Sequence, residues 1–224
     1  MDEKTRFLRS LKTRGCPSCD ELICVAENYY ARFIADLADN TECQEKYAAA
    51  GGFCPFHAWQ LEQFSSRRGL AAGLPRFLER LASLLTEHAL ADKSWINMPD
   101  LVKTPRDCCL CDLLSNREGV YTAGIVHLLE SKEVQDAYAQ SQGFCLIHLR
   151  KIMHQSVTAE TRRFLMEHAV RSLREMARQM ENCRAKYESL QRHKLTRDEK
   201  DVVFRALVHT AGARRLPPQI YYGK

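Results

Sequence analysis

Long apolar runs are missing from this 224-residue sequence. No stretch approaches the roughly 18 consecutive apolar residues of a membrane-spanning helix, so we expect no membrane span. The first ten residues, MDEKTRFLRS, are charged and lack the apolar segment of a secretory signal. We therefore expect a cytoplasmic protein. In that compartment thiols stay reduced, so clustered cysteines favour metal or redox chemistry over disulfides.

The motifs of several enzyme classes are also missing. There is no Gly-x-Gly-x-x-Gly, no Walker loop and no Gly-x-Ser-x-Gly. Each Cys-x-x-Cys is followed by an aspartate, Asp20 or Asp112, where a c-type haem would need histidine. The βαβ pattern around a thioredoxin-like redox pair is absent as well. We assign no catalytic residue and do not expect an enzyme.

Strand-like alternation is almost absent, and helical periodicity replaces it. Over residues 20–38, Leu22, Ala26 and Tyr29 begin an apolar face with the spacing of a helix. Thr196 and Glu199 form a capping-box signal for a last helix. We predict an all-α fold of tandem pseudo-symmetric helical repeats with a long C-terminal helix. Further predicted helices cover residues 41–50, 55–64, 74–85, 111–130 and 159–193, and the second copy adds a short helix after Ser131 and a helix that carries His148.

The chain carries ten cysteines, and an internal repeat organises most of them. The segment ECQEKYAAAGGFCPFH (42–57) matches EVQDAYAQSQGFCLIH (133–148) without a gap. Upstream, CPSCD (16–20) matches CCLCD (108–112). The sequence is therefore a tandem duplication, and each copy reads Cys-x-x-Cys and then Gly-Phe-Cys-x-x-His.

The duplication separates candidate metal ligands from other cysteines. Cys24, Cys43 and Cys183 have no cysteine counterpart, and we interpret them as small apolar residues. Cys109 also lacks a counterpart, but it could take the place of its neighbour Cys108. Alternatively, the repeated cysteines are buried residues of a duplicated apolar core. Core cysteines, however, would not require a histidine at the matching position of each copy. The recurring residues form two Cys₃His sets, typical of tetrahedral metal sites: Cys16, Cys19, Cys54, His57, Cys108, Cys111, Cys145 and His148.

We expect each copy to build its own site. The predicted organisation has a first repeat with the first site (1–92), a connector (93–107), a second repeat with the second site (108–195), and a C-terminal helix with a tail (196–224). Within a copy, the metal would join the Cys-x-x-Cys before the long helix to the Cys-x-x-His that opens a later helix. Such a site would clamp the helices together.

Two metal contents agree with these eight residues. Zinc fits four protein ligands in a closed structural site, and it would make the protein a binding, scaffold or accessory protein. Alternatively, each set holds a four-iron, four-sulfur cluster, because histidine can replace a cysteine ligand. The protein would then transfer electrons or assist a redox enzyme. We favour zinc.

The charge is unevenly distributed. Residues 146–215 hold 16 Lys or Arg and eight Asp or Glu, whereas the whole chain has a net charge of +5. A basic helical region can bind nucleic acid, but no interleaved aromatic residues or helix-turn-helix signal accompanies it. We expect a protein partner rather than nucleic acid.

The repeated motifs resemble those of an uncharacterised bacterial family, a domain of unknown function. Its members carry Cys-Pro-x-Cys and Gly-Phe-Cys-x-x-His-Ala-Trp, which correspond here to CPSC (16–19) and GFCPFHAW (52–59). The resemblance covers most of the chain and implies no established activity. The second copy departs from the pattern: Cys109 replaces proline, and Leu149 and Arg150 follow His148.

Overall fold

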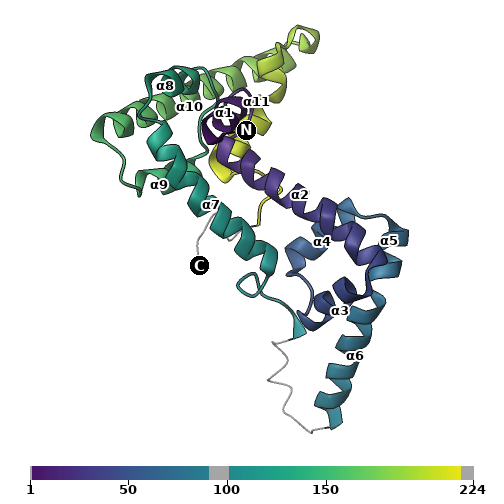
Figure 1. Ribbon diagram of the computed structural model, residues 1–224. Helices are drawn as coiled ribbons and strands as arrows, with labels where there is room; N and C mark the ends of the chain where they lie inside the picture. The colour runs from purple at the N-terminus through teal and green to yellow at the C-terminus, as the bar shows by residue number, and fades with distance from the viewer. Residues whose placement is uncertain (1, 91–100, 218–224) are drawn as a thin grey trace. The chain divides into compact units, whose positions relative to one another are not determined.

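The computed structural model describes residues 2–90 and 101–217, and every regular element in that part of the chain is helical (Figure 1). The predicted all-α fold is therefore confirmed. None of the described helices combines the length and the apolar character needed to cross a membrane.

The chain folds into two compact units. Unit 1 combines Met1–Ile23 with Arg117–Leu216, and unit 2 is built on Cys24–Asn116. Two long helices, α2 (Pro17–Asp39) and α7 (Cys109–Leu128), each begin in one unit and end in the other. The compact units divide the chain after Ile23 and after Asn116, not between the two copies. The repeats 1–92 and 108–195 therefore stay a prediction about the sequence.

Unit 1 contains a short N-terminal helix and most of the C-terminal half. Helix α10 packs against α11, α11 against α9, and α1 against α8. The ring of Phe7, fully buried, stacks on Phe144 with centroids 6.1 Å apart and meets Tyr121 edge-on. Besides its parts of α2 and α7, the unit holds α1 (Glu3–Ser10), α8 (Lys132–Ala139), α9 (Leu146–Met153), α10 (Ala159–Glu188), a 3₁₀ turn (Arg192–Lys194) and α11 (Arg197–Ala211).

Unit 2 is assembled around aromatic side chains. The ring centroids of Phe33 and Tyr47 lie 5.1 Å and 5.2 Å, respectively, from that of Phe53, and Tyr47 also lies 5.3 Å from Phe77. Helix α6 carries Phe77 and packs on α3 and α5. The unit's own helices are α3 (Thr41–Ala49), α4 (Pro55–Phe64), α5 (Arg67–Gly73) and α6 (Pro75–Leu90).

The helix ends agree with some of the predicted signals and correct others. The capping box of Thr196 and Glu199 is present at the start of α11. Helix α3 is capped by Asn40 rather than Thr41, because the Asn40 Oδ1 accepts two backbone N–H bonds. Helix α10 ends at Glu188, five residues before the predicted end, and Leu190 adopts a left-handed conformation with φ 59°.

Two predicted segments lie partly outside the described residues. In the connector, residues 93–100 are outside them, and 101–107 contain no α-helix. In the tail, residues 218–224 are outside them as well.

Candidate metal centres

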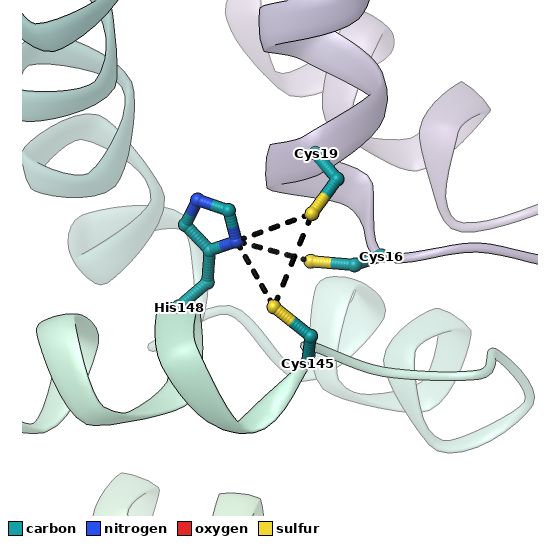
Figure 2. Close-up of side chains that lie close together, drawn as sticks. All are labelled: Cys16, Cys19, Cys145 and His148. Atoms are coloured by element: carbon teal, nitrogen blue, oxygen red, sulfur yellow. Dashed lines mark hydrogen bonds between the residues drawn. The ribbon is translucent and has the colours of Figure 1, made fainter. Parts of the chain in front are cut away.

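The eight predicted ligands gather into two buried groups of four. The His148 site lies in unit 1 (Figure 2) and the His57 site in unit 2. Within each group, the four ligand atoms all lie within 4.8 Å of one another. The His148 site consists of Cys16, Cys19, Cys145 and His148, and the His57 site of Cys54, His57, Cys108 and Cys111.

The expected pairing within each copy is wrong, because every site combines ligands from both copies. Cys16 and Cys19 meet the Cys-x-x-His of the second copy, not that of their own. Two helices, α2 with 23 residues and α3, separate the Cys-x-x-Cys of the first copy from its Cys-x-x-His along the chain. Each pair therefore packs with the pair that belongs to the same compact unit.

The two-residue gap inside each pair follows from helix capping. Cys54 and Cys145 are the N-cap residues of α4 and α9, and each histidine is the third helical residue after its cysteine. Cys16 and Cys108 directly precede α2 and α7 in the same way. Side chains at the N-cap and third positions approach one another, as they do in a capping box. Each site thus lies at two helix N-termini, whose partial positive charge favours thiolates.

Glycine is required immediately before each Phe-Cys pair. Gly52 and Gly143 have φ of +74° and +75°, where residues with a Cβ are strained. A Cβ on Gly52 would come within 2.9 Å of the Phe77 ring, and one on Gly143 within 2.8 Å of the His168 ring. The repeated glycines therefore let the chain turn tightly beneath a ring and deliver the cysteine to the site.

The repeated tyrosine also supports this loop. The Phe144 backbone N–H donates to the Tyr138 hydroxyl at 3.1 Å, within a fully buried environment. The equivalent Tyr47 is buried beside Phe53 in unit 2. The duplication marked both tyrosines, but their spacing alone gave them no role.

The ligand atoms in each site are spaced evenly. In the His148 site, the Nδ1 of His148 lies 3.5 Å from the sulfurs of both Cys16 and Cys19, and 3.1 Å from that of Cys145 (Figure 2). The sulfurs of Cys19 and Cys145 are 3.9 Å apart.

The His57 site repeats this spacing. The Nδ1 of His57 lies 3.4 Å from the sulfurs of Cys54 and Cys108, and 3.3 Å from that of Cys111. The sulfurs of Cys54 and Cys111 are 3.7 Å apart. In both sites, the imidazole therefore faces all three sulfurs through the same ring nitrogen.

Crowding strongly perturbs the thiols. Hydrogen bonds from Cys16 and Cys19 hold the pKa of the Cys145 thiol far below its ordinary value, whereas burial raises the pKa of Cys16. A hydrogen bond from Cys111 likewise lowers the pKa of Cys108. In each group, the neighbouring thiols thus lower the pKa of one cysteine. A bound divalent ion would displace the thiol protons, so its binding would depend on pH.

The surroundings of the two imidazoles differ. The Nε2 of His148 lies 3.0 Å from the buried carboxylate of Glu118, which accepts two 2.7 Å hydrogen bonds from Lys151. Near the other site, the Tyr30 hydroxyl donates to the backbone oxygen of His57 at 2.8 Å and lies 3.5 Å from the Gln60 side-chain oxygen. No sequence signal marked these residues, because their chemical types do not recur between the copies.

The remaining cysteines lie outside both groups. Cys24 is exposed, and Cys43 and Cys183 are half-buried. Cys108 belongs to the His57 group, whereas the exposed Cys109 lies 3.7 Å from the Tyr29 hydroxyl. The structure therefore brings Cys108, and not its neighbour, to the other three ligands.

Comparison with known proteins identifies a family. A model of the family of unknown function DUF6062 matches residues 13–215, which include all eight candidate ligands. The chain belongs to this family. Neither the curated proteins nor the solved structures that were searched gave a match. DUF6062 membership agrees with the predicted resemblance to a family of unknown function and brings no activity with it.

Proposed function

We propose that this DUF6062 protein binds two zinc ions, one in each Cys₃His group, and uses them to hold its helices in place. The spacing of the ligand atoms carries the proposal. Zinc–sulfur bonds of about 2.3 Å and zinc–nitrogen bonds of about 2.0–2.1 Å give tetrahedral edges of about 3.8 Å between sulfurs and about 3.6 Å between sulfur and nitrogen. The distances in the two groups, 3.7–3.9 Å between sulfurs and 3.1–3.5 Å between sulfur and nitrogen, are close to these values.

The same spacing argues against a four-iron cluster. In such a cluster the cysteine sulfurs bind at separate iron corners, with inorganic sulfides between the irons, so they lie much farther apart than ligands of one ion. A single iron ion would fit the spacing as well as zinc does. Zinc remains our choice because a closed set of four protein ligands is typical of its structural sites.

A structural role follows from what the groups connect. One ion would tie the start of α2 to the start of α9, and the other would tie α7 to α4. All eight ligands are buried, and four protein ligands leave no position open for a water or a substrate. We therefore propose a scaffold or accessory protein that acts through a protein partner rather than an enzyme.

Metal analysis of the purified protein tests the proposal. We expect colourless protein with two zinc ions per chain after anaerobic purification with both zinc and iron supplied. Cys54→Ser should leave one ion, in the His148 site, and Cys145→Ser should leave one in the His57 site. As a matched control, Cys43→Ser should keep both.

Other metal contents would overturn the assignment. About four irons and four sulfides per group, with broad visible absorption that bleaches on reduction, would favour electron transfer. One iron ion per group would still tie the helices together, but iron would replace zinc as the bound metal. No bound metal at all would contradict the proposal.

A further inference from the structure

Among the described residues, a partly buried ion pair lies beside the imidazole of the His148 site alone. His148 is fully buried, and its Nε2 lies 3.0 Å from an Oε1 of Glu118, whose side chain is 8% exposed. The Nε2 of His148, like that of His57, has no hydrogen bond that meets the geometric criteria among the described residues, so the observation that separates the two sites is this close approach of a carboxylate. Lys151 donates to both oxygens of the same carboxylate. The lysine thereby offsets the cost of burying a charge.

In the described part of the chain, no such pair lies beside His57. The residue that matches Glu118, seven positions after the second cysteine of its helix, is Ala26, and Gln60 stands where Lys151 stands. Among the described residues, the buried Nε2 of His57 has no hydrogen-bond partner. If Nδ1 binds the metal, Nε2 carries the proton, and a buried N–H without a partner is unfavourable.

We propose that Glu118 is a positioning residue for the His148 site and makes the two metal sites unequal. This inference rests on the proposed function. A carboxylate that accepts the second N–H of a metal-bound histidine fixes the ring's tautomer and orientation and makes the ligand nitrogen more basic. The His148 site should therefore bind its ion more tightly and release it more slowly. The His57 site is the exchangeable one.

This inequality gives the two units different responses to scarce metal. The His148 site fills first and retains its ion, so unit 1 stays folded. The His57 site empties first, and the start of α7 loses its tie to α4. Unit 2 then depends on metal supply, although both units carry the same donor set.

Release of metal to a chromogenic chelator tests the inference. Two-zinc protein mixed with excess chelator should release its ions in a fast and a slow phase. Cys54→Ser should abolish the fast phase, and Cys145→Ser the slow one. Glu118→Gln should accelerate the slow phase by about 10-fold to 100-fold, the usual cost of losing such a partner, and leave the fast phase unchanged.

A matched control separates positioning from general stability. Glu199 is also a buried carboxylate of unit 1, and Lys186 donates to it at 2.8 Å and 2.7 Å. Glu199→Gln should destabilise the unit without accelerating the slow phase. In ¹⁵N–¹H spectra of the zinc protein, Glu118→Gln should move the His148 Nε2–H signal, and Glu199→Gln should not.

The outcomes are distinguishable. Equal release rates from the two sites, or a slow phase that Glu118→Gln does not alter, would overturn the inference and leave the zinc proposal standing. Protein that binds no metal in either group would overturn both.

Discussion

Units 1 and 2 share a donor set but differ in what surrounds it. Both place three thiols and one imidazole at two helix N-termini, beside a left-handed glycine. In unit 1, the charged pair Glu118 and Lys151 lies behind the histidine, where unit 2 has Ala26 and Gln60. The ligands and the glycine before them are thus the same in both units, whereas the residues behind the histidine differ.

The ring above the glycine shows the same divergence. Phe77 covers Gly52 in unit 2, and His168 covers Gly143 in unit 1. These two residues lie 91 positions apart, the offset of the Gly-Phe-Cys motifs. His168 contacts Tyr138 with ring centroids 4.7 Å apart, as Phe77 contacts Tyr47 at 5.3 Å. The packing role is therefore conserved, but unit 1 has a ring that can be protonated.

Metal removal should unfold both units, and we expect it to have the largest effect on stability. A structural zinc contributes on the order of 10 kcal/mol to folding, similar to the whole stability of a domain. Chelation should therefore lower the helical circular dichroism signal and the Tm, and zinc should restore both. An unchanged melting curve after complete chelation would mean that the apolar cores suffice alone.

Alanine at the two glycines tests whether both units depend on the left-handed conformation beneath the ring. Gly52→Ala and Gly143→Ala each force a Cβ into a left-handed conformation and against a ring. We expect each to cost about 2 kcal/mol or more of unfolding free energy, measured by urea denaturation. Alanine at Gly119, which has open space around it and is helical, should be neutral or stabilising. A smaller cost at Gly143 than at Gly52 would show that His168 moves aside more easily than Phe77, because the backbone strain is nearly the same at both.

The smallest expected effect concerns pH. Burial, together with the charge of Arg171, lowers the pKa of His168 to about 4, against about 6.5 in an unfolded chain. The unfolded state therefore binds more protons between these values, so the contribution of His168 to stability is complete above pH 6.5 and lost progressively toward pH 4.

Exchanging the two rings tests this pH dependence. Allowing for partial solvent screening, the loss at pH 5 should be about 1 kcal/mol. His168→Phe should remove this acid sensitivity from unit 1, and Phe77→His should introduce it into unit 2. Unfolding of zinc-loaded protein at pH 5 and pH 7 measures both. Parallel pH profiles for wild type and His168→Phe would show that His168 does not titrate in this range.

The sequence predicted much of the local structure because the relevant signals are local. Apolar periodicity located α2, Pro55 after two glycines located α4, the repeat of this order located α7, and the Thr196 capping box located the start of α11. The short helices α1 and α5 were not predicted, and α10 ends earlier than its pattern suggests.

By itself, the sequence determined which side chains can serve as ligands, because the duplication repeats each pair at the spacing of an N-cap and a third helical residue. Only the tertiary structure decided which pairs meet. In each copy two helices separate the second pair from the first along the chain, and Cys16 meets His148 rather than His57. The contact between Glu118 and His148 was likewise invisible in the sequence. It depends on how separate helices pack, and no local pattern encodes that.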